Sequence, residues 1–164
     1  MDVPDRIERQ ATLSAPVDRA WRAVGDAREF GAWFGVAFDG PFVAGQRLSG
    51  RMMPTTVDPE VARLQVPFAG KPFDVAVERI EAPRLLSFRW HPFAIDPALD
   101  YSQETSTLVE LELTAVAGGT LLRITESGFS RIPLERRAKA FEANQVGWEH
   151  QLRLVSLYLK GHPA

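Results

Sequence analysis

The stretch NQVGWEHQLRLVSLYL, from Asn144 to Leu159, decides the fold of this chain. Its apolar residues recur at steps of three and four, the spacing of one buried face of an α-helix. This face consists of Phe141, Gln145, Trp148, Leu152, Val155 and Leu159. Gln145 falls within an apolar face, and Asn144 lies at its edge. A buried amide is costly unless it is hydrogen-bonded. The two amides must therefore bond to sheet backbone or a structural water, or border a space that holds a ligand.

The helix that contains this stretch is expected to run from Leu134 to Lys160, and its apolar face needs a cover. Several upstream segments alternate apolar and polar residues, which is typical of antiparallel strands with one covered face. The expected strands are residues 6–14, 46–52, 73–81, 84–90, 107–113 and 120–126. The sequence therefore predicts an α+β fold, in which a curved antiparallel sheet wraps around a long C-terminal helix.

Two short helices are expected directly after the first strand. Pro16 suits the first turn of a helix that ends at Gly25. Asp26 then caps a second helix, and Glu29 completes the spacing of a capping box. This second helix is expected to end just before Gly35. Both helices are short enough to close one end of the sheet.

Two connections, Met53–Pro72 and His91–Glu104, are rich in proline and too long for a tight meander. Connections of this length often serve as lids or binding loops. We therefore expect both segments at the mouth of a cavity, as irregular connections without an assigned element.

The composition indicates an ordinary globular protein, with 164 residues of which 45% are hydrophobic and 24% charged. A single domain over residues 1–164 is expected. The formal net charge is −2 and no basic stripe is visible, which argues against nucleic acid as a partner. The absence of cysteine excludes disulfides and thiolate chemistry. The N-terminus has no signal-peptide pattern and no apolar run could span a bilayer, so a cytoplasmic location is expected.

Six stretches occur in the order seen in a known group of proteins. They are APVDRAWRAVGDAREFGAWF (15–34), GPFVAGQRLSG (40–50), VERIEAPRLLSFRW (77–90), STLVELEL (106–113), ESGF (126–129) and GWEHQLRLVSLYL (147–159). Together they resemble the SRPBCC superfamily of START-related, helix-grip domains, in the branch named after the activator of the 90-kDa heat-shock-protein ATPase. The resemblance covers roughly residues 6–160, and residues 53–72 exceed the usual connection there.

This resemblance implies a helix-grip fold with a hydrophobic cavity between the sheet and the C-terminal helix. It does not imply one chemistry, because related branches include polyketide cyclases and one fold hosts many functions. The residues expected to line the cavity are Trp33, Phe34, Phe88, Trp90, Phe141 and Trp148, with His91, Glu126, Asn144 and Gln145 as its few polar groups. Gly147 is expected to let the helix approach the sheet closely. The alternative for Trp148 is plain core packing.

Glu126 shares strand parity with Leu122 and Ile124, so it is expected to face the covered side of the sheet. A buried carboxylate there is a candidate acid or base. The alternative is that Gly128 bends the chain, so that Glu126 reaches solvent or an arginine. Of the three histidines, His91 is expected near the cavity. No two histidines have metal-ligand spacing, and no nucleophile elbow or phosphate loop is present, so no metal or cofactor is expected.

The leading hypothesis is a non-enzymatic domain that binds a hydrophobic small molecule, apolar or aromatic. The second is an enzyme of the cyclase or dehydratase kind, in which His91 or Glu126 would act as acid or base. The third, suggested only by the name of the family, is a co-chaperone that regulates a heat-shock-protein ATPase. The sequence assigns no catalytic residue, and it leaves open the ligand, a chaperone partner and a homodimer.

Overall fold

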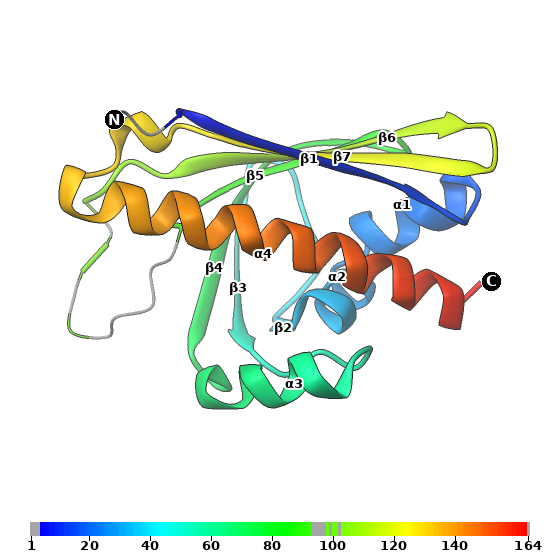
Figure 1. Ribbon diagram of the computed structural model, residues 1–164, viewed down its shortest axis with the longest axis horizontal. Coiled ribbons are helices and arrows are strands. Elements are labelled where there is room, and N and C mark those ends of the chain that lie inside the picture. Colours follow the sequence, from blue (N-terminus) through cyan, green and yellow to red (C-terminus); the bar gives the residue numbers. More distant parts are fainter. Residues whose placement is uncertain (1–3, 93–97, 99, 102, 164) are drawn as a thin grey trace.

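The computed structural model of the chain describes residues 4–92, 98, 100–101 and 103–163. A seven-stranded antiparallel sheet curves around one long helix (Figure 1). The strands are β1 (Arg6–Leu13), β2 (Val36–Phe38), β3 (Arg47–Met52), β4 (Pro72–Glu81), β5 (Leu85–Trp90), β6 (Thr107–Val116) and β7 (Gly119–Ser127). The helices are α1 (Val17–Gly25), α2 (Ala27–Phe34), α3 (Pro59–Gln65) and α4 (Leu134–Gly161), with 3₁₀ turns η1 (Val66–Phe68) and η2 (Phe129–Arg131). The predicted helix-grip fold is confirmed.

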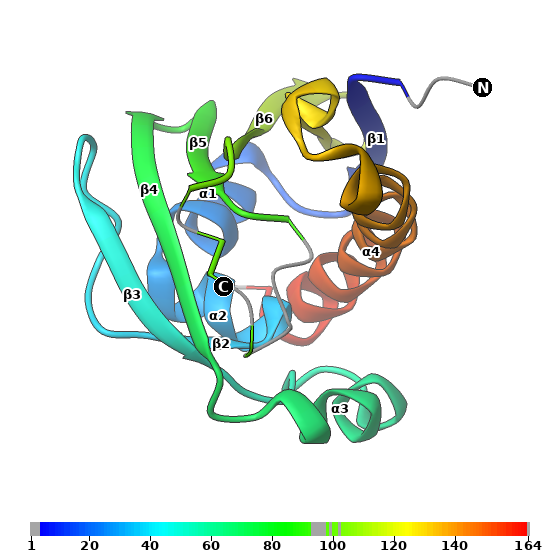
Figure 2. The ribbon, with the colours of Figure 1, turned by 90° about the vertical axis from the view of Figure 1, so that its left-hand side faces the viewer.

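The strand order is β1-β7-β6-β5-β4-β3-β2, and every neighbouring pair is antiparallel. A shift of register between Val77 and Arg79 interrupts the pairing of β4 with β5. Bulges of this kind bend a strand and increase its twist. Figure 2 shows the result, with β1 and β6 at the top, β4 and β3 turned down at the left, and α4 at the right. The curved sheet therefore covers α4 along β1, and α2 also lies against α4 (Figure 2).

The alternation read from the sequence matches the burial of β6. Thr107, Val109, Leu111 and Leu113 are buried, and the residues between them are half-buried. The inward face of the sheet packs against α4 and α2 in one hydrophobic core. Within the described residues, no helix has both the length and the apolar character that crossing a membrane requires.

The predicted cap of the second short helix is confirmed. The Asp26 carboxylate accepts hydrogen bonds from the backbone N–H groups of Arg28 and Glu29, at 2.8 and 3.3 Å. The helix ends at Gly35, whose φ of 101° is the left-handed conformation that glycine adopts without strain. Local capping chemistry therefore fixes both ends of α2, and with them the position of Phe34.

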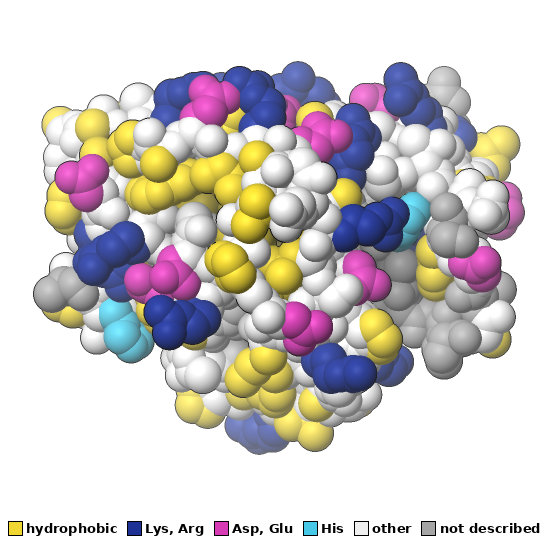
Figure 3. Space-filling view, turned by 180° about the vertical axis from the view of Figure 1, so that it is seen from behind, with side chains coloured by type: hydrophobic (Ala, Val, Ile, Leu, Met, Phe, Trp, Pro, Cys, Tyr) yellow, Lys and Arg dark blue, Asp and Glu magenta, His cyan; other side chains and the backbone are white. Residues whose placement is uncertain are grey.

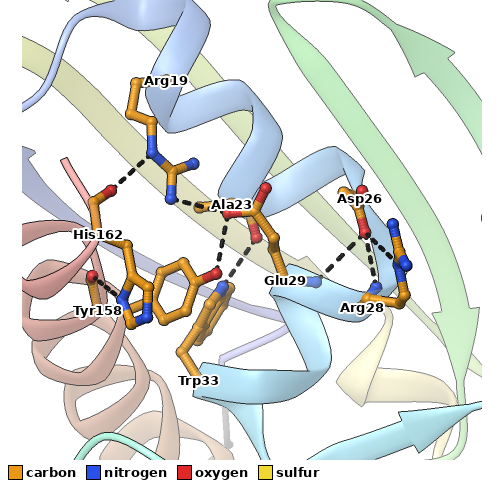
Figure 4. A network of polar contacts seen from close by, with 8 residues as sticks. All are labelled: Arg19, Ala23, Asp26, Arg28, Glu29, Trp33, Tyr158 and His162. Atoms are coloured by element: carbon orange, nitrogen blue, oxygen red, sulfur yellow. Dashed lines mark hydrogen bonds and ion pairs between the residues drawn. The ribbon is translucent and has the colours of Figure 1, made fainter. Parts of the chain in front are cut away.

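A polar network ties the C-terminal end of α4 to α1 and α2 (Figure 4). Arg19 is buried, and its Nε donates to the backbone oxygen of His162 at 2.8 Å. Its Nη2 pairs with Glu29 Oε1 at 2.8 Å, and the Tyr158 hydroxyl donates to the same oxygen at 2.9 Å. Burial, together with this bond to Glu29, raises the pKa of Tyr158. The network anchors the last turns of α4.

The expectation that residues 53–72 form an irregular connection is wrong, because the segment contains α3 and η1. Asp58 accepts hydrogen bonds from the N–H groups of Glu60 and Val61, and Pro59 occupies the first turn. This is a standard helix start that the sequence already contained. The three-residue strand β2 was also not predicted. In the second long segment, residues 93–97, 99 and 102 lie outside the described residues.

The helix α3 lies at the lower end of the molecule in Figure 1 and has no buried residue. Hydrophobic side chains gather at the same lower end in the space-filling view from behind (Figure 3). Leu64 is 75% exposed and Val66 is 58% exposed. Val57 and Val61 pack partly against the core, and a polar contact adds to this attachment. Asp58 pairs with Arg153 of α4 at 2.7 Å.

Candidate functional site

Glu126, near the end of β7, is completely buried, and both of its carboxylate oxygens accept hydrogen bonds. Trp148 Nε1 and Asn144 Nδ2 donate to Oε1 at 2.8 and 2.9 Å. Trp90 Nε1 and Thr107 Oγ1 donate to Oε2 at 2.7 and 2.5 Å. The inward direction predicted from strand parity is correct. The alternative of a partner arginine does not hold, since no Lys or Arg in the described part of the chain pairs with Glu126.

These five residues, the Glu126 cluster, join the sheet to the helix. Trp90 ends β5, Thr107 begins β6, and Asn144 and Trp148 lie one turn apart on α4. Indole and amide N–H groups can only donate, so the carboxylate serves as an acceptor at both oxygens, as expected of its ionised form. Charge-assisted hydrogen bonds of this kind offset much of the cost of burying a charge without an ion pair.

The two indoles of the cluster form part of an aromatic wall. Trp90 and Trp148 are stacked, with ring centroids 5.5 Å apart and planes inclined by 25°. Phe34 lies 6.0 and 6.1 Å from these two rings, and Phe73 lies 5.7 Å from Trp90. Because both indole N–H groups are bonded to Glu126, the indoles offer carbon surface, not donors, to their other neighbours. We call Phe34, Phe73, Trp90 and Trp148 the aromatic wall.

The aromatic wall borders a cavity of about 440 Å³ between α4, the ends of β4 and β5, and the segment around α3. Its lining residues are Phe34, Gly35, Met52, Met53, Gln65, Phe68, Pro72, Phe73, Trp90, His91, Pro92, Ala143, Asn144, Gly147, Trp148 and Gln151. Five residues expected at the cavity are therefore brought together there, namely Phe34, Trp90, His91, Asn144 and Trp148. Glu126 lies directly behind the wall. The described lining contains no Lys, Arg, Asp or Glu.

Besides Glu126, four further residues expected at the cavity do not border it. Trp33 is fully buried between α1 and α2, where its Nε1 donates to the backbone oxygen of Ala23 at 2.8 Å. Phe88 is buried in the core of the sheet. Phe141 packs against the ring of Phe129, with centroids 5.2 Å apart. Gln145 is half-buried and points away, because adjacent residues on a helix differ in direction by about 100°. Asn144 makes the polar contact expected of Gln145.

Two lining residues carry polar atoms without hydrogen-bond partners in the described part of the chain. One is Nδ1 of His91, and the other is Oε1 of Gln151, whose Nε2 donates to the backbone oxygen of Phe34 at 3.2 Å. Burial has the largest effect on the pKa of His91 and lowers it. The nearby carboxylate of Glu104 raises this pKa by a smaller amount. His91 is therefore neutral at pH 7. The sequence reasoning missed Gln151, which lies one turn beyond Trp148 on α4.

Gly147 also borders the cavity, and the structure corrects its expected role. No heavy atom lies within 4 Å of the place where a Cβ would be, apart from the helix itself. The glycine therefore does not allow a close approach of helix and sheet; it faces open space. A glycine inside a helix costs about 1 kcal/mol relative to alanine. No packing contact in the described structure requires that cost.

The segment around α3 supplies one side of the cavity through Met53, Gln65 and Phe68. The Gln65 side chain is fixed by the backbone N–H of Thr55, which donates to its Oε1 at 2.7 Å. The missed lining residue Phe73 could have been found, since it shares strand parity with the buried Val75. Within the described residues, no group of His, Asp and Glu side chains is placed to hold a metal ion.

Residues 14–160 match the family described as Activator of Hsp90 ATPase homolog 1-like protein. The solved structure of DynU16, a protein in the dynemicin biosynthetic locus, is 26% identical with a TM-score of 0.68. That match covers 98% of this chain and 49% of DynU16, so this chain spans about half the length of DynU16.

Two further structures show the same fold. MLL2253 from Mesorhizobium loti is 21% identical (TM-score 0.70, covering 97% of this chain and 99% of that one). CalU16 from Micromonospora echinospora is also 21% identical (TM-score 0.60, covering 94% and 75%). No curated protein matches the sequence.

Proposed function

We propose that this chain, which belongs to the family of Activator of Hsp90 ATPase homolog 1-like proteins, binds a small apolar or aromatic molecule between its sheet and α4. The observation that carries the proposal is the cavity of about 440 Å³ beside the aromatic wall. Small-molecule sites have volumes of about 300–1,000 Å³ and mostly apolar linings with few polar groups. DynU16, whose structure is similar to this chain, comes from a biosynthetic locus, and a domain that binds small molecules fits such a setting.

Glu126 is a positioning residue in this proposal. It is completely buried, and its two oxygens are occupied by the donors of the Glu126 cluster. A general acid or base must come within hydrogen-bond reach of the group that reacts. An enzyme of the cyclase kind would therefore depend on His91, the ionisable side chain among the described lining residues. Regulation of a heat-shock-protein ATPase has support only from the family description.

Gly147 gives the proposal independent support. An alanine at this position would strengthen the helix by about 0.5–1 kcal/mol and would take space from the cavity. A glycine is physically advantageous there if the space is occupied by a ligand. The segment around α3, a helix with no buried residue of its own, would then cover the bound molecule.

The proposal is tested with N-phenyl-1-naphthylamine, a neutral probe whose fluorescence rises in apolar surroundings. The wild-type protein should bind it saturably at one site and lose tryptophan emission, because Trp90 and Trp148 stand in the wall. Gly147→Leu should weaken binding by at least about tenfold, since its side chain would fill the cavity. Val146→Leu, at a 48% exposed position of the same turn, is the matched control and should bind like wild type.

Two results would overturn the proposal. One is the absence of saturable binding to wild-type protein. The other is equal affinity of the wild-type and Gly147→Leu proteins. Native mass spectrometry of protein purified from cell extract would then identify a natural occupant by its mass.

A further inference from the structure

We infer that the ligand preferred by this cavity is an organic cation with a flat or compact apolar body, such as an N-alkylated heteroaromatic ring. The inference rests on the proposed function and adds the sign of the ligand charge. Two observations carry it: the charges around the cavity and the orientation of the aromatic wall.

The charged group that is hydrogen-bonded to the aromatic wall is a carboxylate, which carries a negative charge. Glu126 is joined to the indoles of Trp90 and Trp148, which separate it from the cavity. Its four donors are neutral, so they stabilise the carboxylate without cancelling its net charge. Nearby, Arg136 and Glu104 pair with each other at 2.7 Å and so largely offset one another.

A buried charge acts over a longer range than a surface charge, because little water or salt lies between it and its surroundings. Glu126 is completely buried behind a wall of low polarity. The described lining itself contains no Lys or Arg, and His91 is neutral at pH 7. Lys71 lies beside it, with Nζ 5.1 Å from the ring centroid of Phe68, but this side chain is only half-buried, so water and salt screen its charge. An anionic ligand would lose its hydration without gaining a positively charged partner in the described lining. A cationic ligand would be attracted.

The aromatic wall adds to this preference. Phe34 and Phe73 are inclined by 52–82° to Trp90 and to each other, so rings of several orientations border the cavity. The faces of aromatic rings attract cations, tryptophan most strongly, and the attraction grows when water is excluded. A carboxylate bonded to the indole N–H polarises the ring further in the same direction. The cavity therefore has the electrostatics of an aromatic cage.

The test uses three molecules of nearly the same shape and different charge. They are N-methylquinolinium (cation), 1-methylnaphthalene (neutral) and 1-naphthoate (anion). Binding is measured by calorimetry, and the indole N–H signals of Trp90 and Trp148 in NMR spectra report where each molecule binds. The cation should bind about tenfold more tightly than the hydrocarbon, and the anion should show no saturable binding.

The variant Glu126→Gln removes the charge and keeps the size of the side chain. It should reduce the ratio of the affinities for the cation and for 1-methylnaphthalene several-fold. If this variant does not fold, the comparison of the three molecules on the wild-type protein still tests the inference. Because a buried charge is poorly screened, the preference for the cation should persist in about 0.5 M NaCl. A preference that vanishes with salt would come from the surface and overturn the inference.

The outcomes separate the two proposals. Equal binding of cation and hydrocarbon, or tighter binding of the anion, overturns the inference and leaves the proposed function standing. Failure of all three molecules and of N-phenyl-1-naphthylamine to bind overturns both.

Discussion

The indole N–H groups of Trp90 and Trp148 donate to opposite oxygens of the Glu126 carboxylate, while their rings stack 5.5 Å apart. One tryptophan ends a strand and the other lies in the middle of α4. A single buried side chain therefore sets the spacing of sheet and helix beside the cavity. The stability of the fold and the shape of the candidate site depend on the same hydrogen bonds.

Trp148→Ala should lower the free energy of unfolding by about 3–5 kcal/mol, because a large side chain that is 2% exposed is removed from the core. Trp148→Phe should cost less, about 1–3 kcal/mol, since it keeps a ring but removes one donor to Glu126. Urea unfolding measures both losses. An unchanged midpoint for Trp148→Ala would contradict both a core and a wall role.

Asn144→Asp should be strongly destabilising at neutral pH, by about 3 kcal/mol or more, because it brings a second carboxylate against buried Glu126. The folded pair would hold a proton more tightly than the unfolded chain does. Stability should therefore recover as the pH falls towards about 5. Thermal unfolding across this range checks the prediction. Gln145→Glu is the control and should lack such recovery, since Gln145 does not contact the cluster.

Gly147→Ala should raise the free energy of unfolding by about 0.5–1 kcal/mol, through helix propensity, and weaken binding of N-phenyl-1-naphthylamine. Stability and binding should thus change in opposite directions. Gly161→Ala, at the end of the same helix and also without atoms near its Cβ position, should leave binding unchanged. Stabilisation of Gly147→Ala without loss of binding would show that the probe sits elsewhere.

His91 should make the protein less stable in weak acid. Burial lowers its pKa below the ordinary value of 6.5, so the unfolded chain binds more protons than the folded chain at pH values just below 6.5. The contribution of His91 to stability therefore falls as the pH drops below 6.5, and levels off once the folded protein is protonated. His91→Gln should flatten this part of a plot of stability against pH. His150→Gln, at an exposed site, should not.

Arg19→Met should destabilise the protein by about 3 kcal/mol, because it removes the ion partner of Glu29 and the donor to the His162 backbone. Amide hydrogen exchange should accelerate in the last turns of α4, which the network holds. Arg22→Met, on the exposed face of the same helix, is the control and should change stability by less than about 0.5 kcal/mol. Similar losses in the two variants would contradict the anchoring role.

Most of the elements could be predicted from sequence, because their causes are local. The spacing from Phe141 to Leu159 specified a buried helix face, and the alternation up to Glu126 specified an inward carboxylate. Asp26 capped its helix through bonds two and three residues away. The start of α3 depends on the same kind of local contact, because Asp58 caps this helix. This cap could have been recognised in the sequence.

Only the tertiary structure decided which of these inward-facing residues border the cavity. Periodicity predicts that Trp33 and Trp90 both face inward, but not that Trp33 lies between α1 and α2 while Trp90 borders the cavity. In the same way, Asn144 and not Gln145 reaches Glu126, because the rotation of α4 is fixed by contacts with strands far away in the chain. A local pattern sets the side of an element that faces inward. The depth of the space in front of it depends on how distant elements pack.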